Sequence, residues 1–124
     1  MESLIPRGNT TLDVEFSEQL QRTAEWLNSL PLARLDRERE GGSIADRAFA
    51  ICQEMIRETE SILGLPERKL PRLRAHGAGS QLAVVGQELS EVMASVELDR
   101  INSDLAFMRF ISAFISLRRT GAQR

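Results

Sequence analysis

Residues 98–119 read LDRINSDLAFMRFISAFISLRR, and this stretch decides the fold class of the chain. On a helix of about 3.6 residues per turn, the apolar side chains of residues 105–117 spread around most of the circumference. The narrow polar stripe that interrupts them consists of Arg109, Ser112 and Ser116. A helix that is apolar almost all round has to be buried on several sides. We therefore predict that this helix is either the centre of a helical bundle or half of a subunit interface.

The apolar surface of this helix divides into two nearly opposite faces. Its phenylalanines share one face, whereas Leu98, Ile101 and Leu105 lie on the other. A monomeric bundle is expected to cover only about half of the circumference of one member helix. We therefore predict a homodimer in which the C-terminal helix is largely buried and the phenylalanine face meets a second copy. The predicted interface residues are Phe107, Phe110, Phe114, Ile111 and Leu117.

The rest of the chain predicts three further helices, at about residues 11–30, 43–63 and 80–94, with the last helix at 98–119 and a loose leader at 1–10. Pro31 predicts the end of the first helix, because the residue before a proline avoids the helical region. Ser43 and Asp46 have the spacing of a capping box at the start of the second helix. Gly64 suits the left-handed position after its end. We expect one helical domain spanning residues 1–124.

The junction between the third and fourth helices leaves two possibilities. The apolar register of residues 82–96 does not continue into residues 98–108, which predicts a break near residues 95–99, capped by Ser95 or Asp99. A single bent helix is the alternative. Gly86, inside the third helix, predicts the close approach of another helix. No segment alternates with period two, so the predicted fold is all-α, a four-helix bundle.

Composition restricts the class of protein without identifying it. The 124 residues carry a net charge of −2 and 42% hydrophobic residues, as in an ordinary soluble domain. The longest dense apolar run is too short for a bilayer, which takes about 20 residues, and the N-terminus does not resemble a signal peptide. The lone Cys52 has no partner for an internal disulfide, which favours a cytoplasmic location. We expect no membrane contact.

The residue types that carry chemistry are few and separated. Cys52 lies on the apolar face of the second helix, where burial would keep it a thiol. His76 is the only histidine, and no second histidine or cysteine stands at metal-ligand spacing from it. Residues 76–80 read HGAGS but lack the preceding strand and following lysine of a phosphate-binding loop. We therefore expect no catalytic, metal-binding or cofactor-binding residue and no enzymatic activity.

A basic segment between the second and third helices supports an alternative function. Residues 67–76 contain one carboxylate, Glu67, and a cluster of cations that are candidate contacts for an anion or a nucleic acid: Arg68, Lys69, Arg72 and Arg74. No aromatic residues are interleaved to stack bases, which argues against single-strand binding. The leading prediction is a non-enzymatic helical protein that acts through self-association or another protein partner. The alternative is a nucleic-acid-contacting accessory subunit of a larger ribonucleoprotein or DNA-binding complex.

Overall fold

Four long helices account for most of the computed structural model, which describes residues 11–96 and 99–122. They are α1 (Thr11–Ser29), α3 (Ile44–Leu63), α4 (Ala78–Ser95) and α5 (Arg100–Ala122). A five-residue helix, α2 (Leu32–Asp36), lies between α1 and α3, and a 3₁₀ turn, η1 (Ala75–Gly77), leads into α4. Within the described ranges there is no strand, which confirms the all-α prediction. The predicted leader at residues 1–10 lies outside them.

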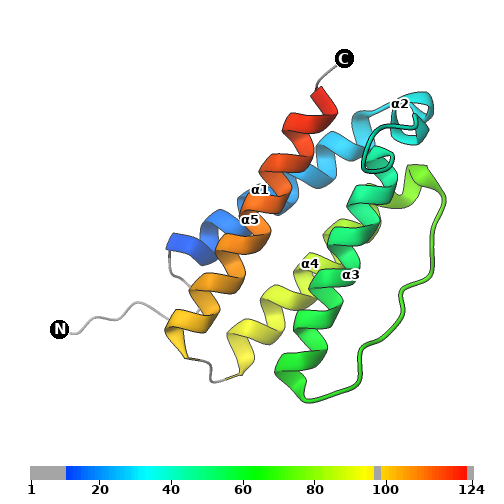
Figure 1. Cartoon of the computed structure of the whole chain (residues 1–124). Helices are drawn as coiled ribbons and strands as arrows, with labels where there is room; N and C mark the ends of the chain where they lie inside the picture. Colours follow the sequence, from blue (N-terminus) through cyan, green and yellow to red (C-terminus); the bar gives the residue numbers. More distant parts are fainter. Residues whose placement is uncertain (1–10, 97–98, 123–124) are drawn as a thin grey trace.

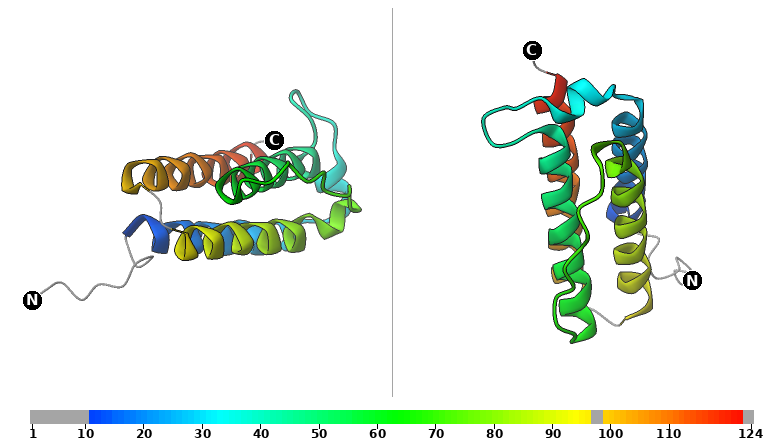
Figure 2. Two further views of the ribbon diagram at one scale, coloured as in Figure 1. Left: turned by 90° about the horizontal axis from the view of Figure 1, so that it is seen from below. Right: turned by 90° about the vertical axis from the view of Figure 1, so that its right-hand side faces the viewer.

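The long helices pack together as a bundle of two layers, with α3 and α5 in one layer and α1 and α4 in the other (Figure 2). Each of α1 and α3 contacts both α4 and α5. Because residues 64–74 return along the outside of the bundle, α3 and α4 run in the same direction (Figure 1). Of these four pairs of long helices, the backbones of α3 and α5 approach each other least closely.

The ends of α3 show how short sequence signals fix the helix boundaries. The Ser43 side chain accepts a hydrogen bond from the Asp46 backbone N–H at 3.0 Å, and the Asp46 carboxylate accepts one from the Ser43 N–H at 3.1 Å. This reciprocal pair is the predicted capping box. Gly64 ends the helix with a φ of 72°, where a side chain would be disfavoured. Both predicted signals are confirmed.

The helices α4 and α5 are separate, so the alternative of one bent helix is wrong. Val96 has extended backbone angles (φ −108°, ψ 141°), which ends α4. Asp99 then accepts a hydrogen bond from the Ile101 N–H at 3.2 Å, as the predicted cap of α5 would. α4 begins two residues earlier than predicted, and α5 extends to Ala122 because its last turn packs beneath Trp26 of α1.

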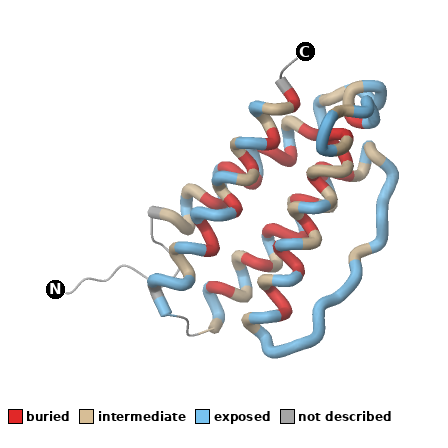
Figure 3. Tube along the Cα trace, in the orientation of Figure 1, coloured by how far each residue is buried: buried red, intermediate tan, exposed pale blue. Residues whose placement is uncertain are grey.

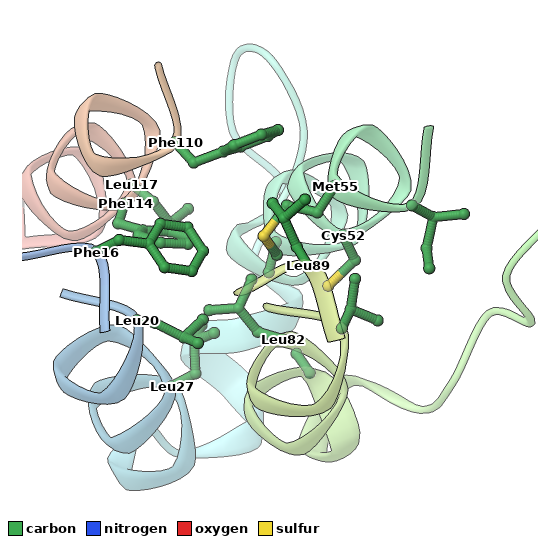
Figure 4. Packing of buried hydrophobic residues seen from close by; sticks show 14 of the residues in the cluster. Phe16, Leu20, Leu27, Cys52, Met55, Leu82, Leu89, Phe110, Phe114 and Leu117 are labelled. Carbon is green, nitrogen blue, oxygen red and sulfur yellow. The ribbon is translucent and has the colours of Figure 1, made fainter. Parts of the chain in front are cut away.

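The phenylalanine face of α5 lies in the core of this chain, which corrects its assignment to a partner interface. Exposed fractions are 5% for Phe107, 2% for Phe110, 0% for Phe114 and 3% for Leu117, and Ile111 is partly buried against the same core. The ring of Phe16, on α1, lies 5.6 Å from the ring of Phe114 (Figure 4). It also lies 5.1 Å from the ring of Phe107. Side chains from α1, α3 and α4 complete this core, so the bundle itself covers the face that was predicted to need a second copy (Figure 3).

Two glycines allow α1 and α4 to approach closely. A Cβ at Gly86 would lie 2.5 Å from the Leu20 side chain, which confirms that this glycine makes room for another helix. A Cβ at Gly79 would lie 2.6 Å from the carbonyl oxygen of Ala24, so there the obstacle is backbone. Backbone cannot turn aside as a side chain can, and Gly79 therefore sets the separation of the two helices.

We predict that Gly79→Ala destabilises the fold although alanine favours helix. The added methyl group forces α1 away from α4, and overpacking of this kind typically costs about 1–3 kcal/mol. Gly77→Ala is the control, because a Cβ there would meet Leu73 at an ordinary 3.4 Å. Urea denaturation measures both free energies of unfolding. Equal stability of the two variants would show that the helix separation adjusts without cost.

Candidate functional site

The predicted anion-binding cations lie on residues 64–74, which we call the strap. The strap runs along the outside of α3 and α4, and most of its residues are exposed (Figure 3). Gln53 of α3 holds its middle: the side-chain NH₂ donates to Glu67 at 2.8 Å and to the Arg68 carbonyl at 2.7 Å. The side-chain oxygen Oε1 of Gln53 accepts a hydrogen bond from the Leu70 N–H at 3.1 Å. One amide thus fixes both the backbone and a side chain of the strap.

Arg68 joins the strap to two helices. Its Nε lies 3.1 Å from Glu60 on α3, and its Nη2 lies 2.7 Å from Glu88 on α4. The Glu60 side chain is only 7% exposed, so its carboxylate depends on this guanidinium for compensation of its charge. The hydrogen bond to Glu88 is the main cause that raises the pKa of Arg68. Arg68 is therefore a structural cation that ties the parallel helices α3 and α4 together.

Arg72 has a structural partner as well. It forms an ion pair with Asp46, the capping residue of α3, and its guanidinium carbon lies 5.0 Å from the centre of the Phe49 ring. The hydrogen bond from Arg72 is the largest of the causes that lower the pKa of Asp46. In the described part of the chain, Lys69 and Arg74 are the strap cations without a hydrogen bond or ion pair. The structure therefore divides the four predicted contacts into two that form ion pairs and two that do not, although the charge of Lys69 contributes to lowering the pKa of Glu67.

We predict that Arg68→Met lowers the free energy of unfolding, whereas Lys69→Met leaves it nearly unchanged. Each variant removes one positive charge from the strap. Only Arg68→Met leaves the buried Glu60 carboxylate without its cation, which should lower the free energy of unfolding by about 1–3 kcal/mol. The second should change stability by less than about 0.5 kcal/mol. Chemical denaturation at pH 7 compares the two. Equal losses would mean that the net charge of the strap, and not the Glu60 pair, is what stabilises it.

The other candidate groups are not gathered into a reactive site. Cys52 is 1% exposed, and burial raises the pKa of its thiol to about 12. His76 lies exposed in η1, whereas Cys52 is on α3. Across residues 11–96 and 99–122, no three histidine, cysteine, aspartate or glutamate side chains are grouped as metal ligands would be.

The outer face of α5 is the apolar surface that the bundle leaves uncovered. Its first half exposes three large side chains, with exposed fractions of 67% for Ile101, 58% for Leu105 and 53% for Met108. Helical periodicity places Ile101 and Leu105 opposite the phenylalanines, but the prediction gave the phenylalanine face to a partner and so chose the wrong face for the core. The size of the side chains could have indicated which face of α5 enters the core, because aromatic rings fill the space between two helix layers better than separate aliphatic side chains do.

The second half of the same face is lined by small side chains. Ser112 and Ser116 are exposed, as the predicted polar stripe requires. Beside them a shallow groove opens between α3 and α5, lined by Gly41, Arg47, Ala50, Ile51, Ala113, Ser116 and Leu117. Arg109 spans the gap between these two helices further along, with its Nη2 3.0 Å from Glu58. The groove therefore has small residues on both helices, Ala50 on α3 and Ala113 on α5, beside the larger side chains of Arg47, Ile51 and Leu117.

Comparisons of the chain with protein-family models, with curated proteins and with solved structures find no match. None of the helices in the described residues combines the length and the hydropathy of a membrane span.

Proposed function

We propose that this chain is a non-enzymatic helical protein that acts through self-association, and that the outer face of α5 is the surface it uses. The observation that carries the proposal is the row Ile101, Leu105 and Met108, more than half exposed on a helix whose opposite face is already buried. These residues recur at helical spacing, so they form one continuous stripe. Contiguous exposed apolar surface with polar residues around it is typical of protein interaction sites.

The remaining exposed apolar side chains do not form a comparable surface. They are distributed over α1, α2, the end of α3, the strap and α4: Val14, Leu32, Leu63, Leu65, Leu73 and Val84. Single exposed apolar residues are normal on soluble proteins and require no partner. The stripe on α5 is therefore the best-supported docking surface in the described part of the chain.

The alternative, a nucleic-acid-contacting accessory subunit, has less support. Such a role needs several free cations on one surface, because phosphate contacts supply most of the affinity. Arg68 and Arg72 are engaged with carboxylates of α3 and α4. Only Lys69 and Arg74 remain of the four candidates, and two exposed cations do not make a phosphate-binding track.

We predict that Leu105→Asp yields a monomer that keeps its helical content. Leu105 is exposed, so the charge does not enter the core, but in a dimer it would be buried without a partner. Val84→Asp is the matched control, since Val84 is 68% exposed on α4 and lies outside the stripe. Analytical ultracentrifugation over a range of concentrations gives the association state, and circular dichroism gives the helical content.

Two results would contradict the proposal. One is a wild-type chain that stays monomeric at about 1 mM, a concentration at which even weak complexes of this size form. The other is a dimer that Val84→Asp dissociates as fully as Leu105→Asp does, which would move the interface to α4.

A further inference from the structure

The two halves of the outer face of α5 have complementary shapes. The first half projects Leu105 and Met108 outward from the bundle. The second half presents the small side chains Ser112 and Ser116, which border a hollow that Ile115, Arg119 and Thr120 also line. A helix surface with projecting side chains at one end and a hollow at the other fits a second copy of itself when the two run in opposite directions.

The charges on this face also differ between its two halves, with an anion in the first half and a cation in the second. Asp104 lies in the first half and Arg119 in the second, and neither makes a hydrogen bond or ion pair within the described residues. They are eight and seven residues from Ser112, about 12 and 10 Å along the axis at 1.5 Å per residue. Ser112 is therefore close to the midpoint between an unpaired anion and an unpaired cation.

We propose that two copies pair through α5 in antiparallel orientation around a two-fold axis close to Ser112. In this arrangement Asp104 of each copy faces Arg119 of the other, so two ion pairs flank the contact. Met108 of each copy lies over the hollow that Ser112, Ile115 and Ser116 line on the other, and Leu105 lies across from Arg119. The inference rests on the proposed self-association and specifies its geometry.

Other arrangements of the same helices place like groups together. A parallel pair would put Asp104 against Asp104 and the projecting side chains against one another. An antiparallel pair centred on Leu105 would bury the apolar row but bring the two Asp104 carboxylates together. Like charges placed opposite each other in an interface disfavour that arrangement. The register at Ser112 is the one that satisfies shape and charge at once.

The expected complex is weak. One face of one helix buries less area than the roughly 1,200–2,000 Å² of stable interfaces. We expect a dissociation constant on the order of 10 µM, with dimerisation weakened by salt because both ion pairs lie at the rim.

A charge-reversal cycle tests the ion pairs. Asp104→Arg and Arg119→Asp should each raise the dissociation constant about tenfold, because each places two like-charge contacts in the dimer. The double variant restores opposite charges and should return to within about threefold of wild type. Glu91→Arg, on the exposed side of α4, is the control for the change in net charge that Asp104→Arg makes. Sedimentation equilibrium measures all five proteins, and circular dichroism verifies their helical content.

Cysteine cross-linking tests the register. The natural Cys52 is buried with a raised pKa, so it does not compete with an introduced thiol. At a two-fold axis the same residue of both copies meets, and closely packed helices bring such positions within disulfide distance. Ser112→Cys should therefore form an intermolecular disulfide on mild oxidation, and Leu105→Cys should form little.

The possible failures are distinguishable. A wild-type monomer contradicts the proposed function and this geometry together. A dimer in which the double charge swap restores nothing, or in which Leu105→Cys cross-links in preference to Ser112→Cys, overturns the antiparallel register at Ser112 and leaves self-association standing.

Discussion

The contact of Phe16 with Phe107 and Phe114 is the interaction on which the rest of the structure depends. It holds the phenylalanine face of α5 against α1, because tilted ring contacts at these distances are favourable and the rings are buried in the core. Once the phenylalanine face is inside, Ile101, Leu105 and Met108 must point outward. The uncovered stripe is thus a consequence of core packing. Its residues can change without emptying the core, which separates association from folding.

The parallel arrangement of α3 and α4 requires a long connection, and the strap provides it. Since α3 and α4 are parallel neighbours, the chain has to travel the length of the bundle between them, and an extended segment without its own helix needs partners for its backbone and charges. Gln53 supplies the backbone hydrogen bonds, and Glu60, Glu88 and Asp46 supply the carboxylates. A segment that looks like a nucleic-acid contact in the sequence is here largely a clamp that closes one side of the bundle.

Local signals made most of the fold predictable from the sequence. Pro31, the Ser43–Asp46 capping box and Gly64 act on neighbouring residues, and the structure has helix ends within a few residues of each predicted position. The pairings that decided the candidate sites are long-range. Nothing near Arg68 in the sequence shows that Glu88 will reach it, and nothing near Phe110 shows which of two apolar faces the bundle will cover. Periodicity describes one helix at a time, and the choice of face depends on all four.

The small side chains on the outer face of α5 connect these observations to the proposed role. Ser112 and Ser116 border a hollow there, which Ile115, Arg119 and Thr120 also line. In the proposed pair, the apolar side chain of Met108 of a second copy lies over this hollow. The same α5 that closes the core on one side then presents both the projecting and the receiving part of an interface on the other.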